Sequence, residues 1–315
     1  MLQFEQACLA RRPAMHFRGN LILLLAAFIW GTTFVAQVVG MDGVGPFTYA
    51  ASRFALGFLF LLGLWRFYRP VRVAGKKAGT YQSGWKPGVI AGLCMFVGVS
   101  MQQVAMLYTT AGKTAFITAL YIILVPIGAV LLGKKLHVEN WIGAGLAITG
   151  LYFLSIRGET AIGLGDGIVL VSSLFWTMQI LFIDRFAALV DPIELSAAQI
   201  GTCFALSAIG AILFEPIHMG NVLAAWVPIC YGGIMSAGVA YTLQIVGQRY
   251  AEPGQAAILM SFEAPFCAVS SWLILGEVMT MAQVAGCALM MAGTTVAQIR
   301  PLFPLLGLDK KKEVC

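Results

Sequence analysis

Residues 21–39 read LILLLAAFIWGTTFVAQVV, an apolar run without a charged residue. A helix needs about 20 such residues, at about 1.5 Å each, to cross the hydrocarbon core of a bilayer. Nine similar runs follow; they are too long for strands and lack the polar-apolar alternation of a membrane barrel. The sequence therefore predicts an all-α integral membrane protein with ten transmembrane helices. The expected spans are residues 21–39, 47–65, 87–107, 114–132, 140–156, 168–186, 192–214, 225–246, 255–275 and 282–299.

The composition excludes a second, water-soluble domain. Hydrophobic residues make up 59% of the chain and charged residues 11%, whereas soluble domains carry about 25% charged residues. If the N-terminus is cytoplasmic, seventeen of the 20 lysines and arginines lie on the inner side, Lys113 and Arg157 lie on the outer side, and Arg53 lies within the second span. This asymmetry predicts a multi-pass protein of the plasma membrane, in a bacterium the inner membrane, with both termini cytoplasmic. Because the basic residues report topology, we expect no nucleic-acid partner.

Cysteine and histidine residues are scattered along the chain, and no C-x-x-C pair occurs. We therefore expect no disulfide, no metal site and no cofactor. The first apolar run is long enough to remain in the membrane as a span, so we also expect no cleaved signal peptide.

The chain carries a weak internal repeat. A shift of 146 residues places Trp30 on Trp176 and Pro46 on Pro192, and a shift of 142 places Tyr108 on Tyr250. The alternative is chance similarity among glycine-rich helices. Five helices per half is an odd number, so the second half enters the membrane inverted, which is typical of secondary transporters. The expected divisions are a cytoplasmic segment 1–18, a first five-helix repeat 19–157, a second repeat 158–300 and a cytoplasmic tail 301–315.

Five stretches carry a resemblance to a known family. They read LLLAAFIWGTTFV (23–35), TAFITALYIILVPIGAVLLGKKL (114–136), WIGAGLAITGLYFL (141–154), GDGIVLVSSLFWTMQILF (165–182) and ILMSFEAPFCAVSSWLILGEVMT (258–280). The chain resembles the EamA-type, ten-helix transporters of the drug/metabolite transporter superfamily. The resemblance implies metabolite export, with helices 5 and 10 at the periphery. Members often have Glu-Pro in helices 4 and 9, whereas helix 9 here has Glu263, Ala264 and Pro265, and helix 4 has no acid beside Pro126.

Glu263, Arg53, Pro126 and Pro265 lie well inside the expected spans, away from their ends. Polar groups at membrane depth need an internal partner or a water-filled cavity, and they often mark function. Glu263 is a candidate for proton coupling or substrate contact, and Arg53 for an anion contact. Alternatively, Glu263 bonds to backbone loosened by Pro265, and Arg53 snorkels outward or packs on carbonyl groups. Pro126 and Pro265 predict kinks in repeat-related helices 4 and 9 and thus a hinge, although membrane helices also tolerate proline.

Aromatic and amide side chains share faces of repeat-related helices. Trp30 and Gln37 are seven residues apart in helix 1, and Trp176 and Gln179 are three apart in helix 6, so each pair lies on one helix face. Such faces can line a cavity for a small organic solute, although aromatic core packing and links between helices are the alternatives. With the polar residues of helices 3, 8 and 9, the predicted substrate-binding residues are Trp30, Gln37, Gln102, Gln103, Trp176, Gln179, Tyr241, Gln244 and Glu263.

These features predict a secondary transporter, an exporter or exchanger, for a small organic metabolite such as an amino acid or related amphipathic compound. It would work by alternating access around a midplane cavity. Its partners would be the lipid bilayer and the solute, and we expect a monomer or weak homodimer. Gly143 and Ala147 form a small-residue contact for dimerisation or internal packing, of which we favour internal packing.

Two other functions are alternatives for this sequence. Residues 163–166 spell the G-x-G-D of intramembrane aspartyl proteases, but that chemistry needs two carboxyl groups at membrane depth. No other span has a central aspartate, and Asp166 is better interpreted as a helix N-terminal charge or cap. We therefore expect no enzyme. A channel or scaffold is the other alternative, and the sequence lacks a polar filter loop that would favour it.

Overall fold

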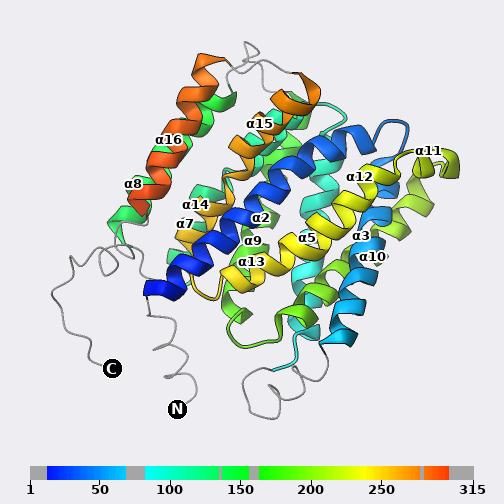
Figure 1. Cartoon of the computed structure of the whole chain (residues 1–315), viewed down its shortest axis with the longest axis horizontal. Helices are drawn as coiled ribbons and strands as arrows, with labels where there is room; N and C mark the ends of the chain where they lie inside the picture. Colours follow the sequence, from blue (N-terminus) through cyan, green and yellow to red (C-terminus); the bar gives the residue numbers. More distant parts are fainter. Residues whose placement is uncertain (1–12, 69–81, 135–136, 156–162, 277–279, 298–315) are drawn as a thin grey trace.

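The computed structural model describes residues 13–68, 82–134, 137–155, 163–276 and 280–297, and these segments are helical apart from short connections (Figure 1). Among the described residues, the one β-type pairing is an isolated β-bridge between Gln82 and Val190. The predicted all-α fold is confirmed. The expected segment 1–18 lies mostly outside the described residues, as do the boundary at 157/158 and the tail 301–315.

Within the described residues, the first half of the chain contains six helices and the second half contains nine helical segments. The first six are α2 (Pro13–Gly40), α3 (Pro46–Phe67), α5 (Trp85–Ala105), α6 (Ala111–Thr118), α7 (Tyr121–Leu131) and α8 (Val138–Ser155). The others are α9 (Leu164–Phe186), α10 (Pro192–Phe214), α11 (Met219–Ala224), α12 (Trp226–Cys230), η1 (Tyr231–Ala240), α13 (Tyr241–Gly247), α14 (Pro253–Met260), α15 (Glu263–Leu275) and α16 (Met281–Ala297).

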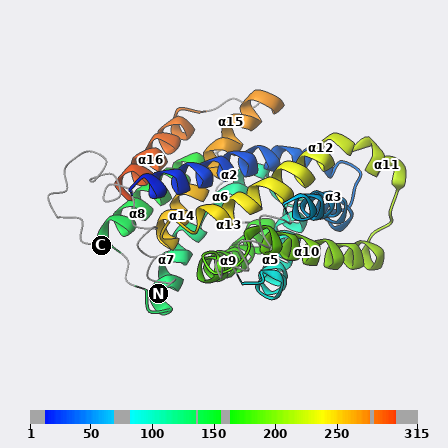
Figure 2. The same cartoon turned by 60° about the horizontal axis from the view of Figure 1, so that its bottom comes forward.

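Eight segments of the described chain are long and apolar enough to cross a membrane. Three of them combine consecutive helices: α6 with α7, α12 with η1 and α13, and α14 with α15. The shorter apolar helix α16 packs against α8, and Figure 1 shows this pair at one edge of the molecule. Figure 2 shows α3, α5, α9 and α10 gathered on one side of α2 and α13. The chain is thus a multi-pass membrane protein.

The fourth and ninth expected spans (residues 114–132 and 255–275), here called helix 4 and helix 9, are both interrupted, at positions related by the 142-residue shift. Helix 4 breaks at Ala119 and Leu120, between α6 and α7, and helix 9 breaks at Ser261 and Phe262, between α14 and α15. Pro265 explains the second break, because proline cannot donate to the carbonyl four residues earlier, here that of Ser261. Pro126 lies inside α7, after the break between α6 and α7, and the kink expected at Pro126 stays a prediction. No proline or glycine accounts for the break in helix 4.

Glycines hold α8 against α16. A Cβ atom on Gly143 would come within 2.6 Å of the carbonyl oxygen of Gly293, and one on Gly150 within 2.5 Å of that of Gly286. In the internal repeat, a shift of 143 residues places Gly143 on Gly286 and Gly150 on Gly293. Gly143 therefore contacts Gly293, the counterpart of Gly150, and Gly150 contacts Gly286, the counterpart of Gly143. This reciprocal pattern is what a two-fold axis between the helices produces. The small-residue face of Gly143 is used for packing within the chain.

Candidate solute-binding cavity

One cavity among the described residues lies at the centre of the bundle, where α2, α3, α5, α9 and the two broken helices converge with η1 and α13. The cavity volume, counted over the positions that the centres of water molecules can occupy, is about 40 Å³. This volume has room for a few waters. The wall is formed by Trp30, Thr33, Phe34, Gln37, Arg53, Gln102, Thr118, Tyr121, Trp176, Gln179, Ile180, Ser236, Tyr241, Gln244, Met260 and Glu263.

Most of the residues singled out in the sequence meet at this cavity. Eight of the nine predicted substrate-binding residues line it, and so does Arg53. Gln103 does not: it is fully buried, and its amide nitrogen lies 3.7 Å from the sulfur of Met41. Pro126 and Pro265 are also absent from the wall. The role of the lining residues in binding stays a prediction.

Glu263 and Tyr121 meet across the cavity wall. The Tyr121 hydroxyl donates a hydrogen bond of 3.0 Å to Oε1 of the buried Glu263. Each is the first residue of its half-helix, α7 or α15, and a helix N-terminus favours a carboxylate. The partner of Glu263 is therefore a side chain and not the backbone loosened by Pro265. Sequence reasoning missed Tyr121, although the 142-residue shift places it on Glu263.

Arg53 is buried inside the protein instead of snorkelling to the surface, with 2% of its area exposed. Its guanidinium carbon lies 4.5 Å from the ring centre of Phe54 and 5.8 Å from that of Tyr49. Within the described chain, Nε of Arg53 has no hydrogen-bond partner. Arg53 therefore brings a positive charge to the wall of the cavity.

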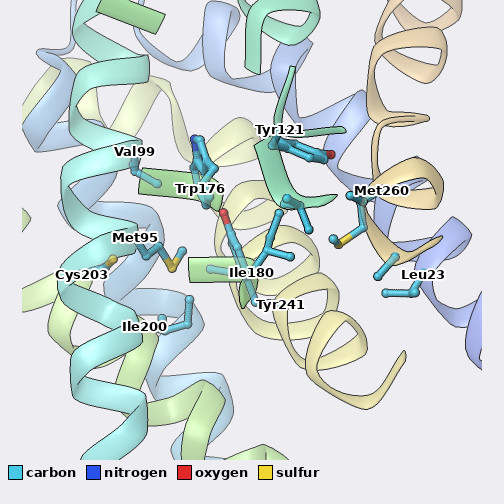
Figure 3. Close-up of a cluster of buried hydrophobic side chains, with 14 of the residues drawn as sticks. Leu23, Met95, Val99, Tyr121, Trp176, Ile180, Ile200, Cys203, Tyr241 and Met260 are labelled. Carbon is cyan, nitrogen blue, oxygen red and sulfur yellow. The ribbon is translucent and has the colours of Figure 1, made fainter. Parts of the chain in front are cut away.

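Three aromatic rings form a row beside these charges. Tyr241 lies between the two repeat-related tryptophans, 4.9 Å from Trp30 and 6.3 Å from Trp176 between ring centres. The rings of Tyr241 and Trp176 are nearly parallel, at 10°, and Figure 3 shows them side by side. The indole nitrogens of both tryptophans are buried without a hydrogen-bond acceptor among the described residues. The three rings thus combine apolar surface with two indole N–H groups that have no acceptor among the described residues.

Several of the amide side chains bond to one another across the helices. The amide nitrogen of Gln244 donates to Oε1 of Gln179 at 3.1 Å, and that of Gln179 donates back to Gln244 and to Gln199, both at 3.2 Å. Gln102 donates to Oγ1 of Thr118 at 2.8 Å. These residues link α9, α10, α13, α5 and α6, which supports the interpretation that part of the amide set connects helices. Gln37 differs, because its Oε1 has no partner in the described chain.

The G-x-G-D segment caps a helix. Asp166 accepts hydrogen bonds from the backbone of Gly163 at 3.0 Å and from the Thr109 hydroxyl at 2.7 Å, and its carboxylate lies 3.5 Å from Nζ of Lys113. These contacts stabilise the N-terminus of α9, as the sequence predicted. Asp166 does not line the cavity. Over the described ranges, no three His, Cys, Asp or Glu side chains gather as metal ligands would.

Comparison with known proteins gives consistent results. The chain matches the EamA-like transporter family twice, over residues 17–156 and 163–298. It is 30% identical to an uncharacterized transporter of Archaeoglobus fulgidus, over 90% of this chain and 86% of that protein. It is 26% identical to the threonine/homoserine exporter RhtA of Escherichia coli, over 84% and 85% of the two chains. A solved structure shares the fold, with a TM-score of 0.69 at 21% identity over 90% of this chain and 97% of that one.

Proposed function

Because this chain belongs to the EamA-like transporter family, as its motifs predicted, we propose that it is a secondary transporter that exports or exchanges a small organic metabolite. The observation that carries the proposal is the central cavity, whose wall combines aromatic rings, amides and two buried charged residues from both halves of the chain. Buried polar groups are costly in a membrane protein unless they serve a site or a partner. The proposal retains the plasma membrane and the cytoplasmic termini predicted from the charges.

Alternating access fits the arrangement of the helices. The breaks in helices 4 and 9 place the first residues of α7 and α15 at the cavity, and broken helices at a central site are typical of inverted-repeat transporters. The cavity is small, so binding and release of a solute need the bundle to open. In this mechanism the two halves would rock around the cavity and expose it to one side of the membrane at a time.

An amino acid is the solute class that we favour. RhtA of Escherichia coli carries the name threonine/homoserine exporter and is similar over most of its length. A small cavity with a cation, a carboxyl group and hydrogen-bonding side chains suits a solute of that size and polarity. Threonine and homoserine are therefore the first solutes to test.

The experiment is counterflow in proteoliposomes that contain the purified protein. Liposomes are loaded with an unlabelled solute, and uptake of the same labelled solute is followed for amino acids, nucleosides, quaternary amines and sugars. We expect saturable counterflow for at least one solute and none in protein-free liposomes. An absence of saturable flux across the whole panel, in both directions, would contradict the proposal. Conductance steps in a planar bilayer would instead support a channel.

A further inference from the structure

We propose that Arg53 binds an anionic group of the transported solute, and that this group is a carboxylate. The inference rests on the proposed function, since it assigns a ligand to the same cavity. It identifies the chemical feature that a solute must carry to be recognised.

Arg53 is a buried cation that forms no ion pair with any residue that the structure describes. Among the described residues, Glu263 is the one acidic side chain on the cavity wall, and it forms no ion pair with Arg53. Burying a charge is costly unless it is paired and hydrogen-bonded. Contacts with the rings of Phe54 and Tyr49 offset part of this cost, but they satisfy no N–H donor. An anionic acceptor is what this environment lacks.

The fold makes space for Arg53 between two helices. A Cβ atom on Gly232 would lie 3.3 Å from Cδ of Arg53, and one on Gly233 would lie 2.7 Å from the Arg53 carbonyl oxygen. Both glycines belong to η1, a π-helical segment that also places Ser236 on the cavity wall. π-Helical turns within longer helices frequently occur at functional sites. The glycines thus let η1 pack closely against α3 at Arg53, and Gly232 leaves room for its side chain.

The repeat shows that the fold does not need a cation at this position. Arg53 lies seven residues after Pro46, the first residue of α3, and Gln199 lies seven residues after Pro192, the first residue of α10. Gln199 is buried, and its Oε1 accepts a hydrogen bond from Gln179. In the second half, a neutral amide therefore links helices where the first half has a charge. The first half of the chain therefore has a positive charge at this position, and the second half has none at the equivalent position.

Two further donors share the cavity with Arg53. The indole N–H groups of Trp30 and Trp176 have no acceptor within the described residues. Together with the guanidinium group, they favour a ligand rich in acceptor oxygens. Arginine binds carboxylates through charge-assisted, often bidentate hydrogen bonds, so a carboxylate fits better than a hydroxyl group.

The test compares solutes that differ only in the carboxylate. L-Threonine is paired with threoninol, and lactate with propane-1,2-diol. Two measurements are made on each protein: competition with counterflow in proteoliposomes, and the shift in melting temperature of the detergent-solubilised protein. For the wild type we expect the carboxylate of at least one pair to act at concentrations at least about tenfold lower than its alcohol, the effect of one hydrogen bond to a charged group.

Three variants locate the effect. Arg53→Gln introduces the residue found at the equivalent position 199, and we expect it to remove the preference for the carboxylate. Arg53→Lys keeps the charge without the planar fork, and we expect an intermediate preference. Arg66→Gln makes the same substitution at an exposed position in the last turn of the same helix, and we expect it to retain the wild-type preference.

The outcomes separate this inference from the proposed function. Equal action of carboxylates and alcohols on the wild type would overturn the inference, and this comparison needs no variant to fold. An undiminished preference in Arg53→Gln would overturn it as well, even if transport is confirmed. An Arg53-dependent melting shift with carboxylates, in a protein that transports none of the solutes, would support the inference and contradict the proposed function.

Discussion

Glu263 is the residue on the cavity wall that is best placed to carry a proton. It is buried at the start of α15, with the Tyr121 hydroxyl as its hydrogen-bond donor. Tyr241 and Arg53 are the other ionisable groups on the wall. When the cavity opens to water, the carboxyl group can exchange a proton, and it would carry that proton when the cavity opens to the other side. Glu263 is therefore the residue through which we expect coupling of transport to the proton gradient.

The first prediction concerns the substitution Glu263→Gln. An amide side chain does not gain or lose a proton between about pH 5 and 9. We therefore expect the solute flux of the variant to lose the pH dependence of the wild type. The measurement is flux into proteoliposomes over a series of internal and external pH values. An unchanged pH profile in Glu263→Gln would remove Glu263 as the coupling residue.

Tyr121→Phe provides the matched comparison for this prediction. It removes the hydrogen bond to Glu263 but leaves the carboxyl group in place, at a cost of about 1 kcal/mol for one hydrogen bond. We expect slower flux that still depends on pH. A flat profile in both variants would show that the hydrogen bond, and not the proton on Glu263, sets the pH dependence.

At the scale of elements, α8 and α16 depend on glycine for their contact. The second prediction is that Gly143→Ala destabilises the protein by about 1–3 kcal/mol, the range for overpacking, because its Cβ would meet the Gly293 carbonyl oxygen at 2.6 Å. Gly145→Ala, on the same helix, has no atom within 4 Å of its Cβ and is expected to stabilise by up to about 1 kcal/mol. Thermal unfolding of the purified variants measures both changes, and equal melting temperatures would contradict this packing.

The third prediction concerns the interruption of helix 9. Because Pro265 cannot bond to Ser261, where the helix breaks, Pro265→Ala restores a donor there and allows a more continuous helix. We expect this variant to transport more slowly, since the break places Glu263 at the cavity. Pro126→Ala is the comparison, and its effect should be smaller because Pro126 lies within α7 and away from the break. Counterflow rates measure the difference, and a larger effect at Pro126 would reverse this assignment.

Elements were easier to predict from the sequence than the details of the site. Helix positions follow from length and apolarity alone, which is all that a membrane span requires. The cavity residues were found because polar groups are costly at that depth. Gln103 lies outside the cavity wall because adjacent helical residues point about 100° apart, so its side chain cannot share the direction of Gln102. The break at Ala119 and Leu120 could not be predicted, since nothing in its local sequence differs from an ordinary helix.

For the whole molecule, alternating access requires contacts that close the cavity at each end of the bundle. At one end, the Glu215 carboxylate accepts hydrogen bonds from the backbone of Phe47 and Thr48, both at 2.8 Å, and so ties the end of α10 to the start of α3. At the other end, the Arg249 guanidinium donates to the carbonyl oxygens of Ala187 and Val190, both at 2.7 Å. The first contact joins the two halves of the chain, and the second joins the end of α9 to the turn after α13, two helices that line the cavity. We expect each contact to hold the cavity closed at its own end.

The fourth prediction is that removing these contacts shifts the protein between its two open states. In proteoliposomes, Ser236→Cys places a thiol on the cavity wall, and a membrane-impermeant maleimide reports its exposure from either side. Adding Glu215→Ala should speed labelling from the side of residues 40–46, because loss of charge-assisted hydrogen bonds favours opening there. Adding Arg249→Ala should speed labelling from the opposite side. The protein with its native Ser236 gives the background, and faster labelling from the same side in both variants would contradict alternating access in this chain.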